Sequence, residues 1–281
     1  PKVPYQQFSH GSDAQVWFRW RTCTAGREQY WHGLLGHDGK PLRRYQEAAR
    51  TAREYHALAA ELDGTTVQTP VAMIYDYETI WALRIQPGFG GNTFHDAMRR
   101  LYNALFRAGM NVDMIRPDQD LAGYRVVFAP DLYLLPDALA ARLEAFVRAG
   151  GVLVADCRTG VKDATNLCHE RTLPGLLGPA LGIRIEEYEA LADPLTVPVR
   201  GRAGFPGTFT ATAAADWVIP EAAEVLTDYG HWHLDGFAAL SRNAFGAGAG
   251  YYVGTVVKEP AFYDALVADV LATAGLRPVV R

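Results

Sequence analysis

The chain has 281 residues, 49% of them hydrophobic, and its 27 Lys and Arg against 31 Asp and Glu give a formal net charge of -4. This composition is typical of a globular protein with one large core or two ordinary ones, and it excludes a largely disordered chain. The sequence has no dense basic cluster and no apolar run of about 20 residues, which argues against nucleic acid and membrane as partners.

Three cysteines (Cys23, Cys157 and Cys168) are too few for a disulfide framework. None of them lies in a C-x-x-C pair or beside a histidine at zinc-ligand spacing. We therefore expect a cytoplasmic protein with no structural metal and no cofactor. The first residues (PKVP) are neither a signal peptide nor a start at Met, so we expect this sequence to be a piece of a larger protein.

The first part of the chain is expected to form one strand, one loop and one helix. Residues 14–20 are aromatic and apolar, which is typical of a short buried strand. Residues 21–40 are polar and contain several glycines, which predicts a long loop. From Pro41 to Leu62, apolar residues recur every three or four positions, so a helix is expected that ends at Gly64.

Beyond a polar linker at residues 65–70, strand and helix patterns alternate. We expect strands at 71–75, 112–115, 124–129 and 152–155, helices at 92–108 and 136–148, some extra strands between 178 and 217, a last strand at 251–256 after a glycine-rich turn, and a closing helix at 260–274. Alternation of this kind predicts a parallel sheet covered by helices on both faces.

The loop after the first predicted strand concentrates side chains that suit a sugar ligand. Five aromatics surround Glu28 and His32 in the sequence, namely Trp17, Phe18, Trp20, Tyr30 and Trp31. Aromatic faces with a few convergent polar groups are typical of sugar sites, and loops at the carboxyl ends of barrel strands build the active sites of (β/α)8 enzymes. The alternative is that the aromatics are packing residues and that Glu28 and His32 stabilise the loop.

Motifs of two kinds follow one another along the chain. Residues 18–21 (FRWR), 28–33 (EQYWHG) and 37–39 (HDG) resemble the last barrel strand and loop of family 42 glycoside hydrolases, the β-galactosidases. Residues 71–78, 81–83, 129–135, 149–154, 158–160 and 245–255 resemble the trimerisation domain of that family, in the same order. The resemblance implies an α/β protein in which the tail of a (β/α)8 barrel (1–64) precedes a doubly wound trimerisation domain (65–281), similar to flavodoxin and to class I amidotransferases.

The same resemblance implies a function and a set of site residues. The intact protein would be a homotrimeric, retaining β-galactosidase acting on terminal β-D-galactosides. Both catalytic glutamates of the family come from earlier barrel strands, so no catalytic residue is expected in this chain. Phe18, Glu28 and His32 correspond to residues lining the galactose subsite, where Glu28 and His32 bind sugar hydroxyls. The spacing from Glu28 to His32 is one residue longer than in some members.

Other functions stay open on the sequence alone. One is a non-catalytic interaction domain of a pseudo-enzyme. Another is an amidotransferase-like hydrolase that uses Cys157, which follows a predicted strand; Asp156 beside it is expected to raise the thiol pKa and to disfavour this chemistry. His231 and His233 could share one face of a strand and bind a metal, but no carboxylate or cysteine stands near them at ligand spacing, which favours an ordinary loop.

Overall fold

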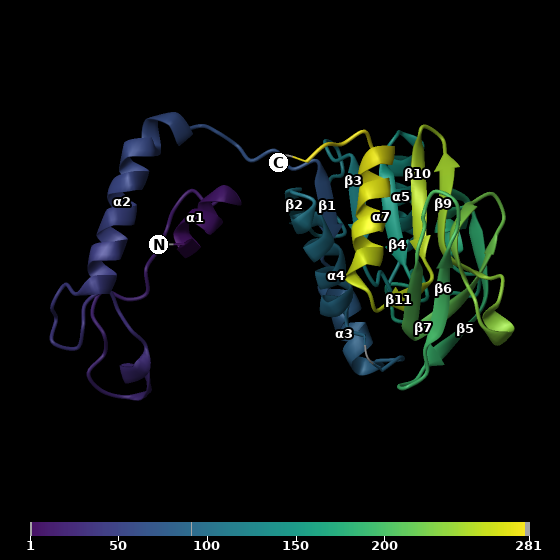
Figure 1. Cartoon of the computed structure of the whole chain (residues 1–281), viewed down its shortest axis with the longest axis horizontal. Coiled ribbons are helices and arrows are strands. Elements are labelled where there is room, and N and C mark those ends of the chain that lie inside the picture. The colour runs from purple at the N-terminus through teal and green to yellow at the C-terminus, as the bar shows by residue number, and fades with distance from the viewer. Residues whose placement is uncertain (1, 91, 279–281) are drawn as a thin grey trace. The chain divides into compact units, whose positions relative to one another are not determined.

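The computed structural model describes residues 2–90 and 92–278, and the chain divides into two compact units. The first unit runs to Gln68 and the second begins at Thr69 (Figure 1). This division falls within the polar linker that the sequence predicts at residues 65–70.

The smaller unit contains two helices and a long irregular loop. Its elements are α1 (Lys2–Ser9), the 3-10 helix η1 (Arg27–Tyr30) and α2 (Arg43–Leu62). The α2 helix begins two residues after Pro41, and Gly64 follows its end with a φ of 73°, so the predicted helix is confirmed. Phe8 of α1 packs on Tyr55 of α2, with ring centroids 4.5 Å apart.

The strand predicted at residues 14–20 is absent, and that expectation was wrong. These residues are irregular in the structure, and Val16 and Phe18 are exposed to solvent. A strand is stable only when a neighbour satisfies its backbone groups, and residues 14–18 have no ladder partner within the described part of the chain. Within the described loop, residues 19–22 do pair with residues 33–35, through backbone hydrogen bonds and one isolated β-bridge between Arg21 and Leu35.

Four parallel strands form one half of the sheet in the larger unit. They are β1 (Val71–Ile74), β2 (Val112–Ile115), β3 (Val126–Ala129) and β4 (Val152–Asp156), and they lie in the order β4-β3-β1-β2. All four match the predicted strands within a residue or two. Strands β1, β3 and β4 are almost continuously apolar because both of their faces are buried.

Helices cover both faces of this half-sheet. These are α4 (Phe94–Arg107) and α7 (Pro260–Thr273) on one face, and α5 (Asp137–Arg148) and the short α6 (Gly178–Leu181) on the other; a further helix, α3 (Tyr77–Ile85), packs against the residues that follow β3. Val71 and Met73 pack with α4 and α7, which lie side by side in Figure 1, whereas Ala72 and Ile74 pack with α5 and α6. The predicted helices are confirmed, and α3 is an addition that the sequence reading lacked.

Antiparallel strands form the other half of the sheet. They are β5 (Ile183–Leu191), β6 (Val197–Gly201), β7 (Thr208–Pro220), β8 (Glu224–Tyr229), β9 (Ala238–Phe245), β10 (Gly248–Val253) and β11 (Thr255–Val257). The β10 strand pairs parallel with β4 and antiparallel with β9, so the described strands form one mixed sheet. The last predicted strand is thus two strands, β10 and β11, which meet at Gly254.

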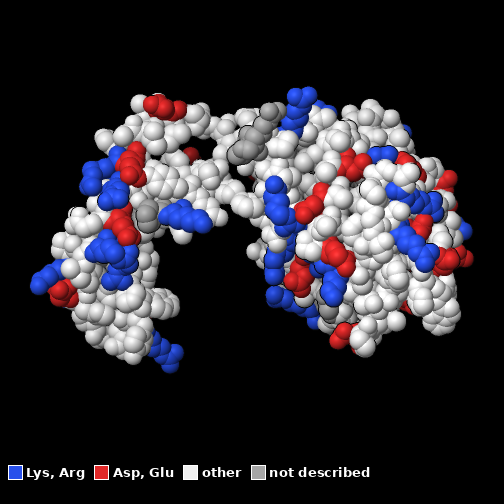
Figure 2. Space-filling model, in the orientation of Figure 1, with Lys and Arg blue, Asp and Glu red and all other residues white. Residues whose placement is uncertain are grey.

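The surface carries charges of both signs. On the face of each unit that Figure 2 shows, Lys and Arg side chains lie among Asp and Glu side chains. Among the described residues, no helix has the length and apolar character needed to cross a membrane.

Candidate functional site

The aromatic loop of the smaller unit displays its rings to solvent. Trp17, Phe18, Trp20, Tyr30 and Trp31 are all exposed, Phe18 by 67%. Phe18 meets Trp31 edge to face with ring centroids 6.3 Å apart, and Trp20 meets Tyr45 of α2 at 6.0 Å. Exposed aromatic faces are chemically suited to contact the apolar face of a sugar ring.

Backbone hydrogen bonds draw the two sides of the loop together. The amides of Leu34 and Leu35 donate to the carbonyls of Arg19 and Trp20, both at 2.8 Å. A Cβ at Gly33 would lie 2.7 Å from the Arg19 carbonyl oxygen, so only glycine permits this approach. The loop therefore holds residues 19–20 beside residues 33–35 by local backbone geometry.

Glu28 lies in η1 and forms an ion pair with Arg19. Its Oε2 accepts a hydrogen bond from Arg19 Nη1 at 2.6 Å, while 48% of the Glu28 side chain remains exposed. The Arg19 guanidinium also lies 5.6 Å from the ring centroid of Phe18. Phe18, Arg19 and Glu28 thus form one cluster, and Arg19 is a member that sequence reasoning missed although it stands inside the FRWR motif.

His32 takes no part in the ion pair or the cation–ring contact of this cluster. Its side chain is exposed and makes no hydrogen bond or ion pair with the described residues. The structure therefore joins Phe18 and Glu28 through Arg19, and it shows no hydrogen bond or ion pair from His32 to either of them among the described residues.

The Phe18–Arg19–Glu28 cluster can bind hydroxyl groups but cannot by itself cleave a glycosidic bond. A carboxylate and a guanidinium supply charge-assisted acceptors and donors beside an apolar ring, as sugar recognition requires. Retaining hydrolysis needs two carboxyl groups roughly 5 Å apart, and this cluster holds a single one, Glu28. The cluster is therefore suited to form one side of a sugar-binding site and not a complete catalytic centre.

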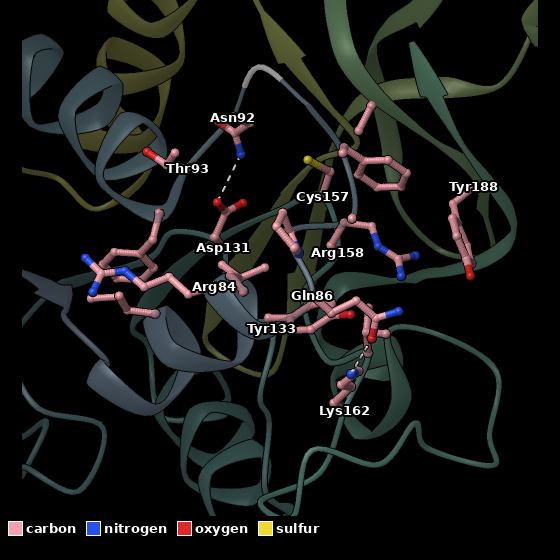
Figure 3. A pocket seen from close by; sticks show the side chains of 18 of the residues that line it. Arg84, Gln86, Asn92, Thr93, Asp131, Tyr133, Cys157, Arg158, Lys162 and Tyr188 are labelled. Atoms are coloured by element: carbon pink, nitrogen blue, oxygen red, sulfur yellow. Dashed lines mark hydrogen bonds between the residues drawn. The ribbon is translucent and has the colours of Figure 1, made fainter. Parts of the chain in front are cut away.

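A second candidate site lies at the carboxyl ends of the parallel strands of the larger unit. A cavity of about 520 Å³ opens there, lined by α3, by residues 86–89 and 92–95 and by the residues that follow β3 and β4 (Figure 3). Such strand ends are where open α/β sheets place ligands. Asp131 and Arg158, which follow β3 and β4, have φ angles of 41° and 69°, rare for residues other than glycine.

Cys157 lines this cavity but is poorly suited to be a nucleophile. Its side chain is 3% exposed, and burial, followed by the negative charges of Asp156 and Asp216, raises the pKa of the thiol well above its usual value. No histidine in the described part of the chain is hydrogen-bonded to it. The predicted effect of Asp156 has the right sign, but burial is the larger cause, and the amidotransferase-like alternative is not favoured.

Asp131, which lines the cavity, and Asp156 beside it carry two buried carboxyl groups. The Asp131 amide donates to Asp156 Oδ1 at 2.6 Å, and Asn92 Nδ2 donates to Asp131 Oδ2 at 3.0 Å. Burial raises the pKa of Asp131 to about 6, against the opposing effect of the Arg100 charge. Burial and the neighbouring Asp131 charge likewise raise the pKa of Asp156. Both groups are therefore easier to protonate than ordinary aspartates.

The histidine pair at 231 and 233 forms no metal cluster with the described residues. His233 Nε2 is 2.7 Å from Glu189 Oε1, and its ring lies on Trp217 at 5.4 Å. No group of three His, Cys, Asp or Glu side chains in the described chain is arranged to hold a metal ion. His233 is accounted for by these contacts.

Comparison with protein families gives two adjoining matches. Residues 69–277 match the family model described as the beta-galactosidase trimerisation domain, and residues 2–58 match the one described as beta-galactosidase. The two matches together span both compact units.

Individual relatives agree with these matches. A beta-galactosidase from Halorubrum lacusprofundi is 38% identical over 97% of this chain, and one from Haloferax lucentense is 37% identical over 97%. The crystal structure of a beta-galactosidase from Bacillus circulans sp. alkalophilus superposes with a TM-score of 0.93 at 30% identity, covering 99% of this chain and 42% of that one. The chain spans about 40% of the length of the curated relatives it matches.

Proposed function

Since the chain belongs to family 42 of the glycoside hydrolases, the β-galactosidase family, we propose that the intact protein hydrolyses terminal β-D-galactosides with retention. The observation that carries this proposal is the ordered match of both units to that family, at 38% identity to a beta-galactosidase over 97% of the chain. Water would be the second substrate and galactose the released sugar.

In this proposal the two units have different roles. Residues 1–64 are the tail of a (β/α)8 catalytic barrel, and residues 65–281 are a doubly wound domain that joins three copies into a homotrimer. The match of 69–277 to a trimerisation domain and the helices on both faces of the β1–β4 sheet support this assignment. The three unpaired cysteines support a cytoplasmic location.

The aromatic loop is proposed to form one wall of the galactose subsite. Phe18 would stack on the apolar face of the sugar, and Glu28 would accept hydrogen bonds from its hydroxyls. Their proximity through Arg19 supports these two roles. His32 is proposed as a further hydroxyl ligand on the resemblance of the EQYWHG motif, and its side chain is exposed to solvent.

The two catalytic glutamates are proposed to lie outside these 281 residues. A test compares the intact protein with the isolated chain on a chromogenic β-galactoside. We expect turnover by the intact protein and none by the chain, because one binding wall cannot supply a nucleophile and an acid/base pair. Proton NMR of the first-formed product should show β-galactose before mutarotation.

Three outcomes would contradict the proposal. Hydrolysis by the isolated chain that survives repurification would place catalysis within it. α-Galactose as the first product would exclude retention. An intact protein that binds galactose but never cleaves a galactoside would instead be the non-catalytic pseudo-enzyme.

A further inference from the structure

The cavity at the ends of β1, β3 and β4 is not used by the proposed galactosidase chemistry. It is formed wholly by residues of the larger unit, and its volume of about 520 Å³ lies within the range of small-molecule sites. Its lining combines basic and aromatic side chains, which Figure 3 shows around a common space.

Lys162 is a buried cation without a carboxylate partner. Its side chain is only 6% exposed, and its Nζ donates to Gln86 Oε1 at 3.2 Å and lies 5.4 Å from the Tyr133 ring (Figure 3). No ion pair joins it to an acid in the described chain. Lysine is almost never buried unless paired, and its ammonium group has three donors, of which Gln86 takes one. The other two donors of the Lys162 ammonium group can be accepted by the oxygens of an anion.

Arg158 presents a second cation to the same cavity. Its Cζ lies 3.6 Å from the ring centroid of Tyr188 and 5.4 Å from that of Phe89, so the guanidinium stacks on Tyr188 with Phe89 beside it. Its Nη1 is buried and has no hydrogen-bond partner in the described structure. The backbone at Arg158 is held at a φ of 69°, the strained turn after β4, so this turn presents a guanidinium to the cavity.

The charge of the lining is positive overall. Arg84 adds a third basic residue, and the single acidic side chain of the lining, Asp131, is engaged by Asn92 at 3.0 Å. A phosphate monoester carries a charge of about -1.5 to -2 near pH 7 and three acceptor oxygens, and it suits an arginine fork beside an ammonium group. The apolar walls, Phe89, Phe94 and Tyr133, suit a ring attached to that phosphate.

We propose that this cavity binds a small phosphate monoester of a ring compound, such as a phosphorylated hexose, with its phosphate held by Arg158 and Lys162. The aromatic walls contact the ring, and the phosphate oxygens accept from the donors that the protein leaves unused. The site is a binding site, and no covalent step is part of the proposal.

Calorimetric titration of the full 281-residue chain tests this site. The probes are inorganic phosphate, glucose 6-phosphate, unphosphorylated glucose and the dicarboxylate succinate. We expect glucose 6-phosphate to bind more tightly than the other three, because it alone offers both the phosphate and the ring. Equal binding of glucose or succinate would overturn the phosphate assignment, and no binding of glucose 6-phosphate would overturn the site.

Variants assign the binding to the two cations. Lys162→Gln and Arg158→Asn should each weaken glucose 6-phosphate binding by about tenfold or more, since each removes a charge-assisted contact. Asn is chosen at 158 because it tolerates a positive φ. Lys258→Gln removes one charge from an exposed lysine outside the lining and should leave the affinity unchanged. Unchanged affinity in Lys162→Gln would refute the proposal even if Arg158→Asn failed to fold.

Discussion

The half-exposed carboxylate of Glu28 could either stabilise the loop through Arg19 or bind a sugar, and the two roles differ in the free energy they contribute. Its ion pair with Arg19 is short, at 2.6 Å, but the side chains are 48% and 32% exposed. Pairs this exposed contribute at most about 1 kcal/mol to stability. A charge-assisted hydrogen bond to a bound sugar contributes about 1.5–3 kcal/mol. A binding role can therefore be separated from a role in loop stability.

Glu28→Gln in the intact protein should lower kcat/KM for galactosides by roughly ten- to a hundred-fold, with little change in melting temperature. The amide keeps the shape of the side chain but loses the negative charge that accepts sugar hydroxyls. Steady-state kinetics and a thermal melt on the same preparation measure both effects. Glu47→Gln, which removes the exposed ion pair with Arg43, is the matched control and should leave kcat/KM unchanged. A lowered melting temperature with normal kinetics would show that Glu28 only stabilises the loop.

Cys157 should react slowly with iodoacetamide at neutral pH. Burial and the charges of Asp156 and Asp216 raise its pKa, so little thiolate is present and the reagent has poor access. Cys168 is exposed and provides an internal comparison in the same chain. Peptide mapping over time should show Cys168 modified well before Cys157. Selective, rapid labelling of Cys157 would restore the amidotransferase-like alternative.

At the scale of elements, two carboxyl groups at the ends of β3 and β4 are buried, which is electrostatically unfavourable when they are ionised. Asp156 is the last residue of β4 and Asp131 comes two residues after β3, and their carboxyl groups are held in a buried region where ionisation is unfavourable. Asp131 also has a φ of 41°. Strain and buried carboxyl groups thus occur together at the strand ends that line the cavity, as is common at ligand sites.

The raised pKa of Asp131 predicts a pH effect on stability with a definite sign. Its pKa is about 6 in the folded chain, against about 4 in an unfolded one, so between these values the folded state holds more protons. The contribution of Asp131 to the free energy of unfolding is therefore full below about pH 4 and is lost as the pH rises toward 6. Asp131→Asn removes this dependence.

Urea unfolding at several pH values between 4 and 7 measures this effect. The free energy of unfolding of Asp131→Asn, relative to the parent chain, should rise from pH 4 to pH 6 and then level off. Asp193→Asn, which changes an exposed aspartate without a hydrogen bond to the described residues, is the matched control variant. A difference for Asp131→Asn that stays constant with pH would contradict the raised pKa.

At the scale of the whole molecule, the larger unit has the features of an assembling domain. Residues 69–277 match a trimerisation domain. Tyr77, Trp81 and Ile85 occur at a spacing of four along α3 and are all more than half exposed. Residues at this spacing share one helix face, so α3 presents an apolar stripe to solvent, which is unusual unless a partner covers it.

The isolated chain should self-associate. Sedimentation velocity over a range of concentrations is expected to show a trimer, or a sedimentation coefficient that rises with concentration, because the larger unit resembles a domain with that role. Added salt should not abolish the association if apolar contacts drive it. A strict monomer at tens of micromolar would count against the trimerisation role of this domain.

Local sequence patterns determined most of the elements of the larger unit. The apolar runs of β1, β3 and β4 and the spacing in α4, α5 and α7 are signals contained within a few residues. The missed helix α3 also had a local signal, since Asp76 caps it by accepting from the amides of Glu78 and Thr79. The family resemblance came from the same motifs, and the comparisons bear it out.

Tertiary structure alone decided the features that depend on residues far apart in the chain. Residues 14–20 have strand-like composition but no partner strand in the described chain, so they are irregular. Glu28 pairs with Arg19 because backbone bonds fold the loop. Arg158 and Lys162 become candidate ligand residues only through their contacts with Tyr188, Tyr133 and Gln86, which lie elsewhere in the chain. Burial and pairing are properties of the packed chain, and no local pattern encodes which distant groups will meet.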